Sequence, residues 1–429
     1  MKQILLILFL IFTNSYAHVA TPPHIKDLEV ISQNFDLYAV DNDLNFAQYQ
    51  NNFFAKYYEP WDENLTIDTK SFENGAKFTS DKIYFGENKR EISKAFKDKQ
   101  IESENKSSFP SMSKNAITIR NTDCRHLPTN KPFFKQDGYP FDRIQNSMIH
   151  TNTPIKVLHF SANKDYAFVQ SAYVSGWIKS NDFAYISNEN IKKIKSLKPV
   201  TTTKDEISII DQKDHFVFQA YIGSIFWADE NETLFVAKAD ENANAVVIPT
   251  KLSKYFKPFP IATKKENINQ IANELYAQNY GWGGYLKNRD CSMLLRDFYT
   301  PFGLYLPRNS YDQISDNKDE MISLENKTPE EKLEIIKKYG KPFATLVYMK
   351  GHIMMYVGMS GDNVAIFHSS WGVKLQSKDK LIIGGSFITS LKPGIELEEF
   401  DEKGGTILDK IITLRVFGKK LETLENTKN

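Results

Sequence analysis

The sequence predicts a multidomain α+β protein with a helical N-terminal segment, two small β-barrels and a C-terminal α+β domain. Its 429 residues exceed what one hydrophobic core usually organises, so several domains are expected. Apolar residues recur at helical spacing before residue 110, then in short alternating runs, and again at helical spacing after Pro258. These changes of period mark the expected domain boundaries.

The first residues have the pattern of a secretory signal. An apolar run over residues 4–12 follows Lys2, and the small-residue pattern Ser15-Tyr16-Ala17 comes after it. Such a run is far shorter than the roughly 20 residues that cross a bilayer as a helix. We therefore expect residues 1–17 to be a cleaved signal peptide, with no membrane span and export to the periplasm or cell envelope.

Four domains are expected after the signal. Aromatic residues at helical spacing predict a helical N-terminal domain over 18–110, which ends in the serine-containing stretch before Lys114. Short alternating runs predict one barrel over 111–190 and a second of similar size over 191–262. The mixed helical and strand signals of 263–429 predict an α+β domain that carries the chemistry.

Charge and cysteine content narrow the functional classes. Positive and negative side chains nearly balance, at 54 against 53, and no basic block occurs, so nucleic acid is not an expected partner. The two cysteines, Cys124 and Cys291, lie in different local contexts. A single disulfide between them is one reading in an exported protein, and two free thiols are the other.

A glycine-rich loop leads into the strongest chemical signal. Residues 280–284 read Tyr-Gly-Trp-Gly-Gly, and the amphipathic stretch 291–299 begins with Cys291. A thiol in the first turn of a helix meets the positive end of the helix dipole, which favours the thiolate. Cys291 is therefore the candidate nucleophile, although a cysteine can also simply pack at a helix start.

Two histidines stand on successive strand-like runs, His352 in 351–358 and His368 in 364–368. Neighbouring strands could place both on one face, so that His352 acts as base for the thiol and His368 orients His352. A metal held by the two histidines is the weaker alternative, because no third ligand stands at a recognisable spacing. No metal and no organic cofactor are expected.

Together these residues resemble a known family. Trp-Gly-Gly at 282–284, Asp-Cys-Ser at 290–292, Gly-His-Ile-x-x-Tyr-x-Gly at 351–358 and the second histidine resemble the NlpC family of cell-wall cysteine peptidases. The resemblance implies a papain-like catalytic domain with a Cys-His-His triad, and the strings around 289–313 and 366–372 are similar to the branch with an N-terminal stabilising domain and two bacterial SH3 domains. Met293 departs from the family, which has glycine there.

The resemblance also implies substrate-binding residues. Tyr280, Asp290 and Ser292 match motif positions of the substrate pocket or oxyanion region. In relatives that act on murein stem peptides, an acidic residue of the first SH3 domain holds the free amine of L-Ala, and a tyrosine of that domain lines the cleft. Asp142 and Tyr173 are the matching candidates, with loop polarity and barrel packing as the alternative explanation.

The reaction that the resemblance implies is hydrolysis of the bond between γ-D-glutamate and the diamino acid of a murein stem, L-Ala-γ-D-Glu-diaminopimelate, through a thioester acyl-enzyme. A monomer is expected. Two alternatives remain open: an amidase or acyltransferase that uses the same residues on another acyl substrate, and an inactive wall-binding protein. The joint presence of Cys291, His352 and His368 argues against the second alternative.

Overall fold

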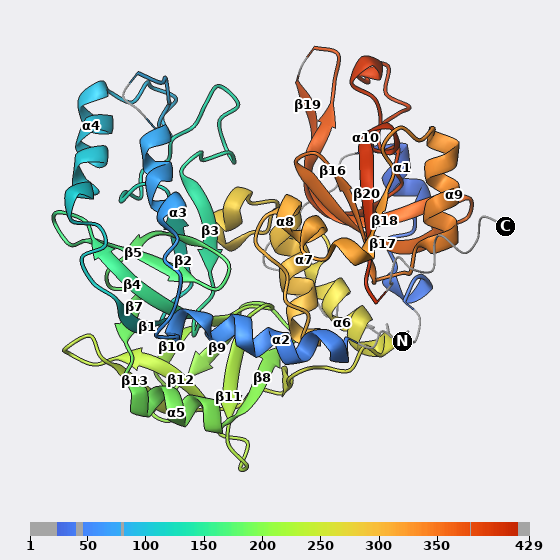
Figure 1. Cartoon of the computed structure of the whole chain (residues 1–429). Coiled ribbons are helices and arrows are strands. Elements are labelled where there is room, and N and C mark those ends of the chain that lie inside the picture. Colours follow the sequence, from blue (N-terminus) through green and yellow to red (C-terminus); the bar gives the residue numbers. More distant parts are fainter. Residues whose placement is uncertain (1–23, 40–45, 79–80, 378, 419–429) are drawn as a thin grey trace, which may run out of the picture.

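The computed structural model describes residues 24–39, 46–78, 81–377 and 379–418. The expected signal peptide lies outside these residues. The first β-rich region and the C-terminal domain stand side by side, and the second β-rich region lies below the first (Figure 1). Within the described ranges, no helix is long and apolar enough to cross a membrane.

The first β-domain, residues 114–185, is built from one antiparallel sheet in the order β3-β2-β6-β5-β4-β1-β7. Its strands are β1(Lys114–Thr118), β2(Thr122–Arg125), β3(Gln145–Ile149), β4(Pro154–Phe160), β5(Tyr166–Ser171), β6(Ser175–Lys179) and β7(Phe183–Tyr185). Its core contains Ile155, Val157, Val169 and Ile178 together with Cys124. Both cysteines of the chain are free thiols, and Cys124 is fully buried, so the structure contains no disulfide between them.

The second β-domain, residues 198–258, follows helix α5(Asn188–Ser196). A five-stranded sheet has the order β13-β12-β11-β8-β14, and β9 and β10 form a separate pair. The strands are β8(Lys198–Thr202), β9(Ile207–Ile210), β10(Phe216–Ala220), β11(Ile225–Ala228), β12(Leu234–Ala239), β13(Ala245–Thr250) and β14(Phe256–Pro258). This region is β-rich as expected, but its assignment as a second SH3 domain stays a prediction.

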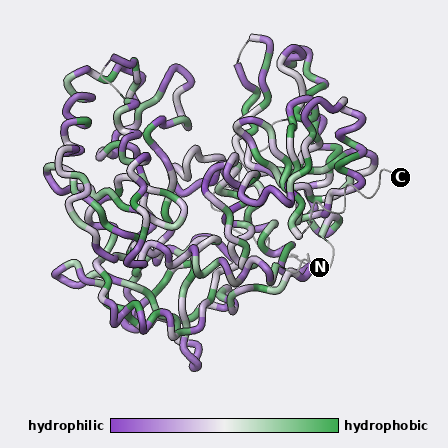
Figure 2. The backbone as a smooth tube through the Cα atoms, viewed as in Figure 1, coloured by the Kyte–Doolittle hydropathy of each residue, from purple (hydrophilic) through white to green (hydrophobic). Residues whose placement is uncertain are grey.

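The C-terminal domain contains a six-stranded antiparallel sheet in the order β15-β20-β16-β17-β18-β19. The strands are β15(Met321–Ser323), β16(Thr345–Met349), β17(His352–Ser360), β18(Asn363–Lys374), β19(Lys380–Thr389) and β20(Ile411–Val416). The helices of this domain are α6(Lys265–Leu275), α7(Cys291–Tyr299), α8(Ser310–Ser315), α9(Pro329–Tyr339) and α10(Ile407–Lys410). Hydrophobic residues run along the strands inside this domain (Figure 2).

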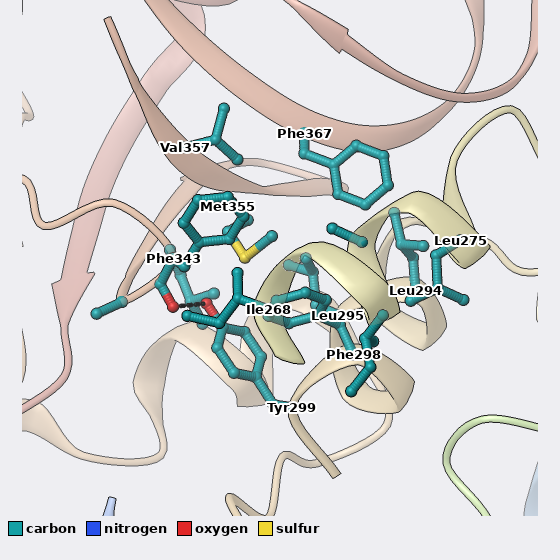
Figure 3. Packing of buried hydrophobic residues seen from close by; sticks show 14 of the residues in the cluster. Ile268, Leu275, Leu294, Leu295, Phe298, Tyr299, Phe343, Met355, Val357 and Phe367 are labelled. Carbon is teal, nitrogen blue, oxygen red and sulfur yellow. Dashed lines mark hydrogen bonds between the residues drawn. The ribbon is translucent and has the colours of Figure 1, made fainter. Parts of the chain in front are cut away.

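Helix α7 is held against the sheet by its apolar face. Leu294, Leu295 and Phe298 are fully or almost fully buried and belong to one cluster with Met355 of β17 and Phe367 of β18 (Figure 3). Their spacing repeats the helical period that the sequence shows. Because each such side chain contributes roughly 1.5–3 kcal/mol on burial, the position of the helix start is firmly set.

The described residues of the N-terminal segment, 24–39, 46–78 and 81–109, do not gather around a core of their own. Its helices are α1(Lys26–Val30), α2(Ala47–Tyr58), α3(Thr69–Glu73) and α4(Lys94–Ser103). Phe35 is buried in the core of the C-terminal domain, Trp61 in a cluster with the second β-domain, and Phe72 against the first β-domain. The described part of the segment therefore packs on all three bodies, and the expectation of a helical domain over 18–110 stays a prediction.

Candidate active site

The loop before α7 depends on two glycines. Gly283 and Gly284 have φ values of 60° and 78°, a region that favours glycine. A Cβ on Gly284 would lie 2.7 Å from Cβ of Met148 in the first β-domain, and one on Gly283 would lie 2.9 Å from Cγ of Gln145. The glycine-rich stretch therefore allows the loop to pack directly on β3, which brings the first β-domain beside the start of α7.

Asp290 caps α7 and fixes its first turn. Its Oδ1 accepts the Met293 N–H at 2.8 Å and its Oδ2 accepts the Gly283 N–H at 2.9 Å. Capping by an aspartate stabilises a helix by about 1 kcal/mol. The family departure at Met293 leaves this cap intact, because the cap uses only the backbone N–H, while the Met293 side chain is buried.

Cys291 is the first residue of α7 and is half-buried. Backbone N–H groups of Ile353 and Ser292 point at its sulfur and lower the pKa of the thiol, as a helix start should. Burial is the larger effect, however, and together with the Asp290 carboxylate it raises the pKa of Cys291 to about 12. Burial therefore opposes the effect of the helix start on the pKa of this thiol.

The two histidines meet as expected from neighbouring strands. Nε2 of His352 lies 2.7 Å from Nδ1 of His368, and Nε2 of His368 lies 2.9 Å from Oγ1 of Thr389 at the end of β19. Burial lowers the pKa of His352 to about 4, and burial followed by the neighbouring His352 holds the pKa of His368 well below its usual value. Both rings are therefore neutral at ordinary pH.

Arg308 holds the polar groups beside the sulfur. Its guanidinium donates to both carboxylate oxygens of Asp290, at 3.1 and 2.7 Å, and to the Ser292 hydroxyl at 2.9 Å. Its Nε donates to Ser147 Oγ of the first β-domain at 2.6 Å. Burial alone would raise the pKa of Asp290, but Arg308 and the backbone donors hold it below its usual value.

A cavity of about 1030 Å³ contains the candidate residues. We call its lining residues within 280–410 the catalytic wall and those within 126–175 the β-domain wall. Cys291, His352 and His368 line the catalytic wall. Asp68, Ser71 and Asn74 of the N-terminal segment also line the cavity.

Four of the five predicted substrate residues lie at this cavity. Tyr280, Asp290 and Ser292 line the catalytic wall, and Tyr173 lines the β-domain wall. The Tyr173 hydroxyl accepts the His150 N–H at 3.3 Å, and its ring lies 3.7 Å from the guanidinium carbon of Arg296, measured to the ring centroid. Their roles toward a substrate stay predictions.

Asp142 is placed differently from the expectation. Its side chain is fully buried, and its Oδ2 accepts from Nη2 of the buried Arg125 at 2.7 Å. Its Oδ1 accepts backbone N–H groups of Phe133 and Ile144, at 2.9 and 3.2 Å. Both oxygens are committed inside the first β-domain, and Asp142 is not among the cavity-lining residues. In this structure it supports the turn and does not face a substrate amine.

A buried ionic network joins α7 to both β-domains. Arg289, directly before the cap residue, pairs with Asp205 of the second β-domain at 2.5 Å and with Asp297 of α7 at 2.7 Å. Asp297 in turn lies 3.0 Å from Nε2 of His150 in the first β-domain. No spacing in the sequence signals this network, because its members come from three distant segments, around residues 150, 205 and 289–297.

Arg308 and Thr389 were also missed. Arg308 stands in the motif string that supports the family resemblance, so its pattern was visible while its role was not. Thr389 carries no sequence signal, since buried threonines are common in strands. Within the described part of the chain, no group of three or more His, Cys, Asp or Glu side chains is arranged to hold a metal ion.

Comparisons with known proteins agree with this architecture. Three family models match: the NLPC_P60 stabilising domain (N terminal) at residues 3–109, an SH3 domain of the SH3b1 type at 130–179, and the NlpC/P60 family at 277–387. One SH3 domain is matched where two were predicted. None of the curated proteins matches the chain.

One solved structure shows the same fold over nearly the whole chain. A structure described as a novel NlpC/P60 endopeptidase from Photobacterium damselae subsp. piscicida is similar with a TM-score of 0.82 and 22% identity, over 94% of this chain and 99% of that one. An NlpC/P60 family protein from Bacillus cereus gives a TM-score of 0.46 and 13% identity, over 70% of this chain and 98% of that one.

Proposed function

Because the chain carries an NlpC/P60 domain with that family's stabilising domain and an SH3 domain, it belongs to the NlpC/P60 family of cysteine peptidases, and we propose that it cleaves the γ-D-glutamyl-diamino acid bond of murein stem peptides. The observation that carries this proposal is the half-buried Cys291 at the start of α7, in a cavity that His352 and His368 also line. No other residue in that cavity is a cysteine.

The reaction starts from the neutral pair. The Cys291 sulfur attacks the γ-carbonyl carbon of D-glutamate while His352 accepts the thiol proton, and the oxyanion forms near the N–H of Cys291. That N–H is at the first helical position, where no intrahelical acceptor exists. The C–N bond then breaks, the proton on His352 passes to the leaving amine of the diamino acid, and a thioester remains. Water, activated by His352, hydrolyses it.

The surrounding polar groups suit a peptide with several charges. We assign Tyr280, Asp290 and Ser292 to the substrate pocket and Tyr173 to its opposite side, because all four side chains line the cavity. Asp290 is already paired with Arg308, so an incoming ammonium group would share that carboxylate. The pattern of residues 2–17 supports action in the periplasm or cell envelope. We propose that the protein acts as a monomer.

The test is a digestion of purified muropeptides followed by mass spectrometry. The wild-type protein should release diaminopimelate-containing fragments and leave L-Ala-γ-D-Glu ends, whereas Cys291→Ala should not. Cys124→Ala is the matched control, because Cys124 is fully buried in the first β-domain and does not line the cavity. Products cut at another bond, or joined to an added amine in place of water, would overturn the proposed specificity.

A further inference from the structure

A chain of three hydrogen bonds runs from His352 into the end of β19. It passes from Nε2 of His352 to Nδ1 of His368, from Nε2 of His368 to Oγ1 of Thr389, and from Oγ1 of Thr389 to the carbonyl oxygen of Ser390 at 2.8 Å. Phe387 pairs with His368 across β18 and β19, so the alternation along β19 puts Thr389 on the same face. His368, Thr389 and Ser390 are all buried.

The last bond fixes the direction of the others. A carbonyl oxygen can only accept, so the single hydroxyl proton of Thr389 is donated to Ser390. The Thr389 oxygen must then accept from His368, which places the His368 proton on Nε2. A neutral ring carries one N–H, so Nδ1 of His368 has a lone pair and accepts from His352. The His352 proton is therefore on Nε2, and Nδ1 of His352 carries a lone pair and no proton.

We infer that Thr389 is a positioning residue that sets the tautomers of both histidines and so leaves Nδ1 of His352 unprotonated as the base for Cys291. The inference rests on the proposed function for the identity of the reacting pair. The three-bond chain ends on a main-chain carbonyl, which cannot reverse its role, so the hydrogen-bond direction does not depend on bound water or substrate.

Loss of the hydroxyl should release this control. In Thr389→Val the Nε2–H of His368 would be buried without an acceptor, which favours the other His368 tautomer. His368 would then donate from Nδ1, His352 would have to accept on Nε2, and the His352 proton would move to Nδ1. That nitrogen could no longer take the thiol proton. Because valine has nearly the shape of threonine, packing changes little.

The first experiment compares Thr389→Val with Thr389→Ser and with Thr413→Val, a matched control on β20 of the same sheet. We expect kcat on the stem peptide to fall about 10- to 100-fold in Thr389→Val with KM little changed, and to stay within about threefold of wild type in the other two. Alkylation of Cys291 by iodoacetamide, which needs no peptide, should slow in parallel. Wild-type kcat and alkylation rate in Thr389→Val would overturn the inference.

The second experiment reads the tautomers directly, in the wild-type protein. Selective 15N labelling of the eight histidines, with His352→Gln and His368→Asn used for assignment, should show both rings protonated at Nε2. A proton at Nδ1 of His368 in the wild type would overturn the inference whether or not any variant folds. If the wild type cleaves no muropeptide while Thr389→Val still slows alkylation and shifts the tautomers, the proposed function fails and this inference stands.

Discussion

The two walls of the cavity use their charged groups in opposite ways. On the catalytic wall the Asp290 carboxylate and the Arg308 guanidinium pair at the cavity surface, beside the sulfur. On the opposite side the Asp142–Arg125 pair points into the first β-domain. Among the described cavity-lining residues of the β-domain wall there is no carboxylate, and Arg143 is charged. The catalytic wall therefore supplies reactive and paired groups, whereas the β-domain wall supplies shape and positive charge.

The buried Asp142–Arg125 pair is connected to the loop before Cys291 through the side chain of Gln145. Arg125 donates to Oε1 of Gln145 at 2.8 Å, and Nε2 of Gln145 donates to the carbonyl oxygen of Gly283 at 3.0 Å. Asp142 thus holds Arg125, which holds the side chain that contacts the loop before Cys291. A buried charged residue can therefore hold the loop of a candidate active site in place without contacting the substrate.

The largest effect is expected when the sulfur of Cys291 is removed from the catalytic wall. Cys291→Ala should lower hydrolysis by about 10⁴-fold or more without loss of the fold, because the exchange removes one half-buried atom. The measurement is the single-turnover rate on stem peptide, with thermal unfolding as a check. Cys124→Ala should keep both activity and sensitivity to iodoacetamide. Equal activity in Cys291→Ala and in the wild type would show that Cys291 is not the nucleophile.

A smaller loss is expected at His368, which orients His352 and is not placed to move the thiol proton. His368→Ala should reduce kcat by about 10²- to 10³-fold, while His368→Asn should retain more activity because its amide oxygen can replace the Nδ1 acceptor. Steady-state kinetics on both variants decide this. Equal and complete loss in the two variants would indicate direct chemistry at His368, and sensitivity to a chelator would then point to a metal.

Asp142→Asn tests the buried Asp142–Arg125 pair that lies next to the β-domain wall. Breaking a buried ion pair on one side typically costs about 3–5 kcal/mol, so the free energy of unfolding should fall by that order, measured by urea denaturation. The folded variant should keep the wild-type ratio of rates on L-Ala-γ-D-Glu-diaminopimelate and its N-acetylated form.

The opposite outcome would restore the sequence prediction for Asp142. If the variant remained as stable as wild type but lost a preference for the free amine, the carboxylate would have to face the substrate. Arg143→Gln provides the control for this wall, because Arg143 lines the cavity and lies outside the Asp142–Arg125 pair.

The smallest effect should appear in the pH profile. His352 must be unprotonated to accept the thiol proton, so kcat/KM should fall as pH drops through its pKa, which burial lowers to about 4. The rate should therefore be nearly flat from pH 7.5 down to about 5.5. Thiolate absorbance at 240 nm should be absent from the free enzyme in this range, since burial raises the pKa of Cys291. A thiolate band at pH 7 that Cys291→Ala removes would show a preformed ion pair.

The candidate reactive residues of the catalytic wall could be predicted from the sequence, but few of the contacts that position them could. Cys291, His352 and His368 could be predicted because each stands in a short segment whose residue types and period are informative on their own. The burial of Asp142 could not be predicted, because the direction of its side chain depends on Arg125, which lies 17 residues earlier on β2. The network around Arg289 spans 147 residues between His150 and Asp297, a contact that no local pattern encodes.

The domain plan shows the same limit. The changes from helical to strand period located the β-rich regions, because those periods are properties of each strand or helix. The packing partners of the N-terminal helices could not be predicted. An amphipathic helix has the same sequence pattern whether it packs on a core of its own domain or on that of another domain. Phe35 and Phe72 look alike in sequence and pack on different bodies.

The path of the N-terminal segment has a consequence for the order in which the chain is completed. Gln33 hydrogen-bonds to Ile388 through both its amide nitrogen and its carbonyl oxygen, across 355 residues. Residues made early in synthesis can reach their final contacts only after nearly the whole polypeptide exists. The core beneath α7 is then among the last parts to close, so a nascent or truncated chain would hold Cys291 in an unfinished site. The peptidase would become active only as a complete molecule.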